Sequence, residues 1–224
     1  MIKNPVLTRT LQVLVSVLVL LILILTGVRL LLTETFVRFE YQQKSFPPDT
    51  YGMTKDERLT YAPIALEFLL KDVPPSFLGD LRFDDGAVMF NERELQHMVD
   101  VQTLTQLFLK VWYGSLVLFL VIGLAAWRGD WLGEFRKMVS TAGLSTIIVL
   151  GTLVLLLLLS FDVVFVGFHR IFFEGDSWLF LYSDTLIRLF PEKFWQDAFL
   201  LVGAFSFLGG VLLWLGLRRK QNQA

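Results

Sequence analysis

Four long apolar stretches constrain this chain more than any other feature of its sequence. Each approaches or exceeds the roughly 20 residues that a helix needs to cross about 30 Å of hydrocarbon. Hydrophobic residues make up 54% of the chain and charged residues only 18%, a composition poorly suited to a soluble surface. The sequence therefore predicts a single membrane domain over residues 1–224, with spans at about 11–32, 104–127, 139–166 and 194–217.

Basic residues in the short flanking segments predict the orientation of these spans. They precede the first span, lie between the second and third, and follow the fourth: Lys3, Arg9, Arg128, Arg136, Lys137, Arg218, Arg219 and Lys220. Such residues stay on the cytoplasmic side of a membrane. Both termini are then cytoplasmic, and we expect the first span to stay uncleaved because no small-x-small site follows it. Residues 33–103 and 167–193 then form extracytoplasmic segments.

The first outer segment has enough turn and cap signals to form a small folded cap. Thr54 and Glu57 form a capping-box pattern that starts a helix through "DERLTYAPIALEFLL", although Pro63 suggests a kink or a later start. The dipeptide Asp85–Gly86 separates two short apolar runs, which predicts a β-hairpin. The expected fold class is a mainly α integral membrane protein, with four spans and an extracytoplasmic cap of short helices and a hairpin.

His97 follows a second helix start and precedes the second span. Asn91 and Glu94 have capping-box spacing, and nothing in "ERELQHMVDVQTLTQLF" interrupts a helix that continues into the span. Glu94 and Asp100 are three residues to either side of His97, where a carboxylate can reach and orient the imidazole. The alternative is a solvated helix face on which the histidine has no function.

His169, the only other histidine, follows the third apolar stretch in "FDVVFVGFHRIFF". Asp162 is seven residues earlier, close to the same helical face. A carboxylate facing lipid costs about 2.5–3.5 kcal/mol at a helix centre, so we expect Asp162 to face the protein or water. It is a candidate for positioning substrate or supporting His169, and the alternative is a structural hydrogen bond between helices.

Several classes of chemistry lack their characteristic residues. The chain has no cysteine and a net charge of −1, so we expect no thiolate metal site and no nucleic-acid partner. H-E-x-x-H, G-x-S-x-G, Walker and dinucleotide-binding motifs are absent from the sequence. A metal site of two histidines and one carboxylate is possible by count. The pattern favours imidazole acid–base catalysis without a metal or cofactor.

The boxes "FNERELQHMVDV" and "FDVVFVGFHRIFFEGDSWLF", with the following "LIRLFPEKFWQDAF", resemble the lipoprotein intramolecular transacylase family of bacterial four-span membrane proteins. The resemblance covers nearly the whole chain in order and topology. It implies a location in the bacterial cell membrane and one extracytoplasmic catalytic histidine from each box, matching His97 and His169. It also implies transfer of an acyl chain from the glycerol sn-2 oxygen of a diacylglyceryl-cysteine lipoprotein to the α-amino group of the same cysteine. The product is a lyso-form lipoprotein.

The residues suit this chemistry. An α-amino group with a pKa near 8 must lose a proton before it attacks an ester, and a histidine is suited to accept that proton. The other histidine would protonate the glycerol oxygen, and the sequence leaves the division of roles open. Arg93 and Arg170 are candidates to stabilise the oxyanion or hold a headgroup, or are interfacial arginines without a chemical role. The expected partners are the diacylated lipoprotein N-terminus and membrane lipid.

Two other functions compete with this hypothesis. A non-enzymatic membrane accessory protein would use both histidines structurally, and a metal-dependent membrane hydrolase would use them as ligands.

The orientation of the spans is directly testable. We expect an epitope tag inserted at Gly129, between the second and third spans, to be inaccessible from outside intact cells. The positive control is a tag at Asp85, in the first outer segment, which antibody should reach. Labelling of the Gly129 tag in unbroken cells would overturn the four-span topology.

Overall fold

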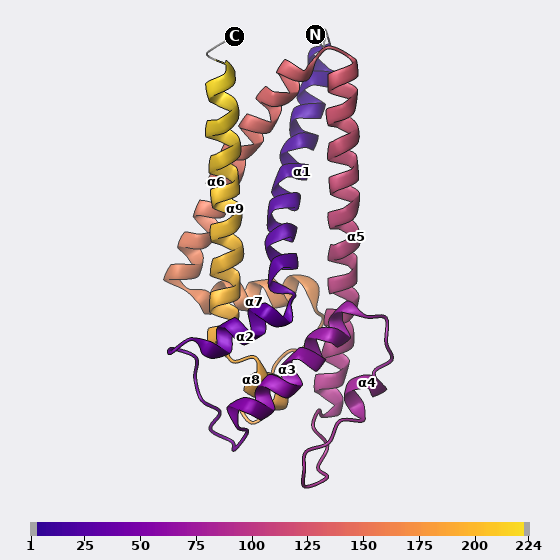
Figure 1. Cartoon of the computed structure of the whole chain (residues 1–224), viewed down its shortest axis with the longest axis vertical. Helices are drawn as coiled ribbons and strands as arrows, with labels where there is room; N and C mark the ends of the chain where they lie inside the picture. The colour runs from indigo at the N-terminus through magenta and orange to yellow at the C-terminus, as the bar shows by residue number, and fades with distance from the viewer. Residues whose placement is uncertain (1–3, 222–224) are drawn as a thin grey trace. The chain divides into compact units, whose positions relative to one another are not determined.

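The computed structural model describes residues 4–221, with side chains as far as Arg218. These residues form nine helices: α1 (Pro5–Leu31), α2 (Glu34–Gln42), α3 (Lys55–Leu70), α4 (Ser76–Gly79), α5 (Glu92–Arg128), α6 (Leu132–Leu159), α7 (Phe161–Phe172), α8 (Thr185–Leu189) and α9 (Glu192–Gln221) (Figure 1). They divide into two compact units. The first contains α1 to Arg29, Leu109–Leu159 and α9 from Leu200, and the second contains Leu30–Phe108 and Ser160–Phe199.

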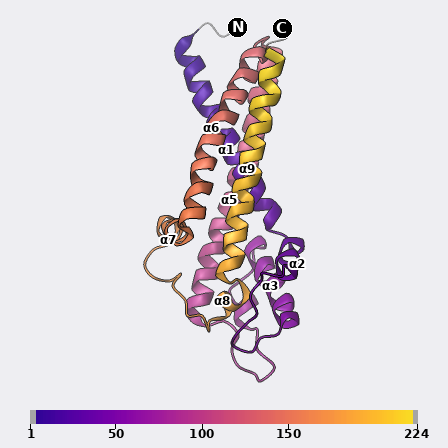
Figure 2. The same cartoon turned by 90° about the vertical axis from the view of Figure 1, so that its left-hand side faces the viewer.

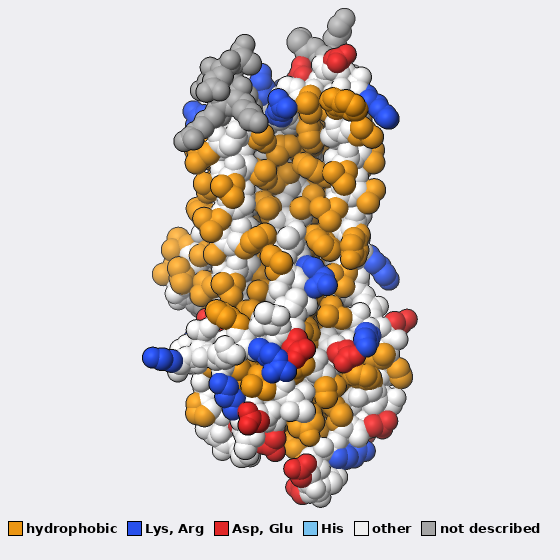
Figure 3. Space-filling model, viewed as in Figure 1, with side chains coloured by type: hydrophobic (Ala, Val, Ile, Leu, Met, Phe, Trp, Pro, Cys, Tyr) orange, Lys and Arg blue, Asp and Glu red, His pale blue; other side chains and the backbone are white. Residues whose placement is uncertain are grey.

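Four helices in the described part of the chain are long and apolar enough to cross a membrane. They are α1, α5, α6 and α9, and each coincides with most of one predicted apolar stretch. Their outward side chains are apolar as well: Val13 is 64% exposed, Leu120 67% and Leu212 73%. Figure 3 shows hydrophobic side chains covering most of the visible surface along these helices. A helical surface of this kind suits lipid rather than water.

The helices of the first unit approach one another closely at small residues. A Cβ atom built on Gly143 of α6 would lie 2.7 Å from the carbonyl oxygen of Gly210 on α9. Nearby, the Ser140 hydroxyl donates a hydrogen bond to the carbonyl oxygen of Trp214 (3.1 Å). Helices in lipid associate through such contacts, because burial of apolar surface gives no net gain when the surroundings are already apolar.

The second unit has a conventional hydrophobic core. Its most deeply buried side chains include Phe68, Leu78, Phe90 and Leu189, each at most 1% exposed. They come from α3, α4, the segment that precedes α5, and α8. Side chains of α2 pack on the same core. Figure 2 shows α2 and α3 next to each other within this unit.

Both predicted capping boxes are confirmed. Glu57 accepts a hydrogen bond from the Thr54 N–H (2.6 Å), and Thr54 Oγ1 accepts one from the Glu57 N–H (3.2 Å). Pro63 lies inside α3 without ending it. At the start of α5, Glu94 and Asn91 exchange the equivalent pair of bonds. As predicted, one unbroken helix then carries the chain from this cap through the second apolar stretch.

The predicted β-hairpin in residues 81–90 is wrong, because the described residues contain no strand. Arg82 and Val88 form only an isolated bridge across a turn in which Gly86 has a φ of 84°. The consecutive residues Met89 and Phe90 are both buried, at 2% and 1% exposed. Two backbone hydrogen bonds cross the turn, from the Phe83 N–H to the Ala87 carbonyl oxygen (3.0 Å) and from the Met89 N–H to the Leu81 carbonyl oxygen (3.2 Å). The pairing ends there, because Met89 and Phe90 pack into the core and the chain enters α5.

The third apolar stretch, residues 139–166, is divided between two helices. Ser160 leaves the helical conformation (φ −159°, ψ 85°), α6 ends before it, and α7 begins at Phe161. Asp162 therefore lies in the first turn of a new helix. Hydropathy is continuous across this serine, so a sequence window gives no sign of the break.

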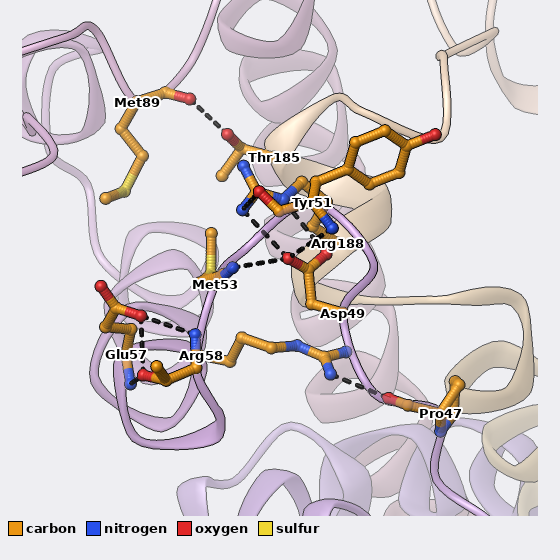
Figure 4. A network of polar contacts seen from close by, with 10 residues as sticks. Pro47, Asp49, Tyr51, Met53, Glu57, Arg58, Met89, Thr185 and Arg188 are labelled. Atoms are coloured by element: carbon orange, nitrogen blue, oxygen red, sulfur yellow. Dashed lines mark hydrogen bonds and ion pairs between the residues drawn. The ribbon is translucent and has the colours of Figure 1, made fainter.

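A buried ion pair fixes α8 to the loop that precedes α3 (Figure 4). Arg188 donates to both carboxylate oxygens of Asp49 (3.2 and 3.1 Å), whose side chain is only 2% exposed. The backbone N–H of Met53 donates to the same carboxylate (2.7 Å). Burial opposes ionisation of Asp49, but the guanidinium and the backbone donors outweigh it and hold the pKa of this carboxyl below its usual value.

The glycine contact in the first unit predicts a position-specific effect of one methyl group. We expect Gly143→Ala to destabilise the folded protein by about 1–3 kcal/mol, because the added Cβ overlaps the backbone of α9. The matched control is Gly133→Ala on the same helix, where a Cβ meets open space and should be neutral or stabilising. Thermal unfolding in detergent compares the two. Equal melting temperatures would contradict the close α6–α9 approach.

Candidate active site

The structure brings the two histidines together in the second unit. His97 lies in the second turn of α5 and His169 near the end of α7. Their ring centroids are 6.1 Å apart and their planes are inclined by 23°. His97 is only 8% exposed. Residues 72 positions apart in the sequence, 97 and 169, therefore form one imidazole pair, in which His97 is buried and His169 is partly buried.

A backbone contact fixes the tautomer of His169. Its Nδ1 lies 2.8 Å from the carbonyl oxygen of Phe165, one turn earlier on α7. A carbonyl oxygen only accepts hydrogen bonds, so Nδ1 carries the proton. In the neutral ring, Nε2 then holds a free lone pair. Burial lowers the pKa of His169, although the bond to Phe165 opposes this shift.

His97 is more strongly desolvated and lacks the equivalent bond. Its Nδ1 is buried and has no hydrogen-bond partner among the described residues. This residue lies before the apolar stretch 104–127, within the folded second unit. Burial lowers the pKa of His97 to about 4, with a smaller contribution from the charge of His169. A buried imidazole nitrogen without a partner is costly, and such groups are concentrated at functional sites.

Aromatic side chains from residues 173–184, the segment between α7 and α8 that we call the aromatic loop, enclose the pair. Phe173 contacts both imidazoles, with centroids 4.9 Å from His97 and 5.5 Å from His169. Phe180 packs edge-on against His97 (5.3 Å), and Trp178 packs against His169 (4.9 Å). Aromatic composition alone does not distinguish such a site wall from the belt of aromatic side chains that many membrane proteins place at the lipid headgroups.

The two carboxylates expected to orient His97 are engaged elsewhere. Glu94, at 1% exposed, accepts hydrogen bonds from the backbone N–H groups of Asn91 (2.8 Å) and Leu186 (2.7 Å). Asp100 accepts one from the side-chain amide of Gln96 (3.1 Å). Helical spacing brings them near His97 as predicted, but backbone donors and an amide satisfy their oxygens instead of the imidazole.

Of the remaining predicted site residues, two are exposed on α7 and one contacts the aromatic loop. Asp162 is exposed in the first turn of α7, and Arg170 is exposed next to His169. Arg93 lies 5.7 Å from the ring centroid of Phe180 and 3.4 Å from the carboxylate of Asp184. Of these three residues, Arg93 is therefore the one tied to the wall of the site.

A groove of about 420 Å³ borders the site on the side of Phe173. Its lining combines apolar and acidic side chains: Asp100, Thr103, Leu104, Leu107, Phe172, Phe173 and Glu174. Asp100, Leu104 and Leu107 lie three, seven and ten residues after His97, on the same face of α5. The described residues contain no group of three or more His, Cys, Asp or Glu side chains that could hold a metal ion.

The fold and site define a class: an integral membrane protein with four apolar helices and a histidine pair, of which His97 is buried, in a separate folded unit. The sequence model for "Lipoprotein intramolecular transacylase Lit" matches residues 13–195. The chain therefore belongs to the lipoprotein intramolecular transacylase family, as its histidine boxes suggested. Membership supports an acyltransferase role in general.

Known relatives agree in sequence and in fold. An uncharacterised protein of Aquifex aeolicus (strain VF5) is 35% identical over 185 residues, which cover 83% of this chain and 82% of that protein. The membrane integral lipoprotein intramolecular transacylase Lit from Bacillus cereus has a similar fold, with a TM-score of 0.79, 20% identity, and coverage of 99% of this chain and 100% of that one. A single-residue variant of the Bacillus protein gives a TM-score of 0.72 at 21% identity, with 97% and 94% coverage.

The burial of His97 predicts an unusual titration. Because its pKa is lowered, the neutral ring should persist well below pH 6 and gain a proton only near pH 4. With only two histidines in the chain, ¹³C-histidine NMR of the full protein in detergent gives two signals, assigned with His97→Gln and His169→Gln. The denatured protein is the control, with both midpoints near the ordinary value of ~6.5. A native His97 midpoint near that value would contradict the buried geometry.

Proposed function

We propose that this protein moves an acyl chain from the glycerol sn-2 position of a diacylglyceryl-cysteine lipoprotein to the α-amino group of the same cysteine. The product is a lyso-form lipoprotein, and His97 and His169 are the catalytic residues. Family membership supports the reaction class. The observation that carries the chemical assignment is the imidazole pair, in which a backbone carbonyl leaves Nε2 of His169 free to accept a proton.

His169 is the base in this proposal. The substrate amine attacks the ester carbonyl, the N–C bond forms, and the nitrogen loses one proton to Nε2 of His169. Because burial lowers the pKa of His169, the ring is neutral near pH 7 and does not have to be deprotonated first. Fixing Nδ1 on the Phe165 carbonyl also stabilises the imidazolium that forms, since the protonated ring keeps this hydrogen bond.

His97 delivers a proton to the departing glycerol oxygen. When the C–O bond breaks, that oxygen gains one proton, which balances the one lost by the amine. Because the pKa of His97 is about 4, this ring is neutral near pH 7 and first takes the proton that His169 has accepted from the amine; the two ring centroids are 6.1 Å apart. Protonated His97 is a stronger acid than an ordinary imidazolium, so it passes the proton readily to the oxygen, and both rings are neutral again. His97 also has the unpartnered nitrogen needed for such an exchange.

The intramolecular character of the reaction accounts for the lack of a nucleophile motif. Amine and ester belong to one lipopeptide, so the site has to bring them together and move protons rather than form an acyl-enzyme. The aromatic walls exclude water, which would otherwise hydrolyse the ester. We place one acyl chain of the substrate along Leu104, Leu107 and Phe172 in the adjacent groove. In the cell, both termini are cytoplasmic and the site faces outward, where lipoprotein N-termini are exposed.

The reaction is testable by mass spectrometry of a lipoprotein's N-terminal lipopeptide. In cells that make diacylglyceryl lipoproteins, we expect wild-type protein to move one acyl group onto the α-amino nitrogen at unchanged total mass. His97→Gln and His169→Gln should each reduce this product by about 10²–10⁴-fold, the usual size of an acid–base contribution. Asp85→Asn, in an exposed turn away from the site, is the matched control and should retain full activity.

Two outcomes would redirect the assignment. An unmodified lipopeptide despite normal membrane levels of the wild type would favour a non-enzymatic accessory role. Loss of product on adding a chelator, with recovery on adding back a divalent metal, would favour the metal-dependent hydrolase.

A further inference from the structure

Glu94 lies where two segments distant in sequence are joined, and the imidazole pair does not use it. One carboxylate oxygen accepts the N–H of Asn91 at the start of α5 (2.8 Å). The other accepts the N–H of Leu186, 92 residues further along the chain, at 2.7 Å in a buried position. A carboxylate at 1% exposure is costly to bury, and burial raises the pKa of Glu94 despite these donors. A residue with such a cost requires an explanation beyond capping one helix, for which an exposed residue suffices.

The second of these bonds anchors the exit of the aromatic loop. At its entry, the loop continues directly from α7, with the Phe173 N–H bound to the His169 carbonyl oxygen (2.8 Å). Between these two ends, the polar contacts of the loop include short-range ones, such as the hydrogen bond from Trp178 Nε1 to the Gly175 carbonyl oxygen (3.1 Å). The loop therefore depends on its two ends to hold Phe173, Trp178 and Phe180 against the histidines.

Other bonds at the exit are weaker or neutral. Asp184 accepts from Asn91 Nδ2 (3.3 Å) and Arg93 Nη2 (3.4 Å), and the Arg93 side chain is 48% exposed. Thr185 donates its hydroxyl to the Met89 carbonyl oxygen. Exposed ion pairs contribute about 0–1 kcal/mol, whereas a buried, charge-assisted bond contributes more and costs more to break. Glu94 is thus the charged anchor at the first residues of α8, next to the loop, and the buried Arg188–Asp49 pair fixes the other end of this short helix.

We propose that Glu94 is a positioning residue: by joining the starts of α5 and α8, it holds the aromatic loop closed over His97 and keeps that imidazole out of water. Glu94 acts through Phe180 and Phe173, which lie 5.3 and 4.9 Å from the His97 ring, and touches neither substrate nor the reacting atoms. The inference that its loss slows catalysis rests on the proposed function, whereas its effect on His97 does not.

The test is the titration of His97 by ¹³C-histidine NMR in the full chain with Glu94→Gln. The isosteric amide keeps one acceptor oxygen and turns an NH₂ group toward the other backbone N–H, so one of the two joints is lost. Water then reaches His97, and the midpoint should move upward by about one pH unit or more, toward the unperturbed value. The charged groups on the surrounding elements, His169 on α7, Arg93 and Asp100 on α5 and Asp184 at the loop exit, are unchanged in this variant.

Glu92→Gln is the matched control, because Glu92 lies two residues away on the same turn and is exposed. It should leave the His97 midpoint where it is in the wild type. Phe180→Leu removes part of the wall directly and should raise the midpoint even where Glu94 is intact. If Glu94→Gln does not fold, Glu94→Asp, which keeps the charge but is one methylene too short for both joints, takes its place.

A folded Glu94 variant with an unchanged His97 midpoint overturns the proposal, whether or not Phe180→Leu shifts it. If Glu94 only stabilised the fold, its substitution would lower the melting temperature and leave the His97 midpoint unchanged. The expected shift of that midpoint distinguishes the positioning role from a purely stabilising one. For the rate, acyl transfer by Glu94→Gln should fall at least tenfold, with the acid-side midpoint of the pH profile moved to higher pH. A wild type without acyl transfer would refute the proposed function and leave the NMR result to decide the role of Glu94.

Discussion

The buried imidazole of His97, whose Nδ1 has no hydrogen-bond partner in the described part of the chain, is the constraint around which the second unit is organised. Water would satisfy this ring and raise its pKa, so the surrounding structure has to exclude water continuously. Phe173 and Phe180 do so by contact, and the bonds at the two ends of the aromatic loop keep them in place. The buried Arg188–Asp49 pair extends this support, because Arg188 lies on the short helix that follows the loop. The buried polar contacts of the second unit thus help to hold the aromatic side chains that surround His97.

The parts of the fold that depend on local sequence were predictable. Span length follows from bilayer thickness, and the caps at Thr54 and Asn91 follow from side chains that reach only three residues. The failures have equally physical causes. The turn at Asp85–Gly86 has a hairpin signal, but tertiary burial of Met89 and Phe90 overrides it. The break at Ser160 lies inside a run of continuous hydropathy, so only the backbone geometry reveals it.

The candidate site shows the same division. Rare histidines beside apolar stretches were visible in the sequence, and their motifs indicated the family. Their separation of 6.1 Å was not predictable, because it depends on how α5 and α7 pack. Glu94 is the clearest example of this limit. The spacing between Asn91 and Glu94 predicts a local cap, but no local rule connects the second carboxylate oxygen of Glu94 with a backbone N–H in α8. Long-range partners of this kind also determine which aromatics form a site wall and which form a belt.

The hydrogen bond between His169 and the Phe165 carbonyl has a consequence for the evolution of the site. In many enzymes a carboxylate side chain orients the histidine, so one codon change removes the orienting group. Here the acceptor belongs to the main chain of α7, and every amino acid at position 165 supplies it as long as the helix persists. The tautomer is therefore protected against single substitutions of its partner. The Phe165 ring itself packs against His169, with centroids 4.2 Å apart, so a substitution there would change the space beside the imidazole without removing the acceptor.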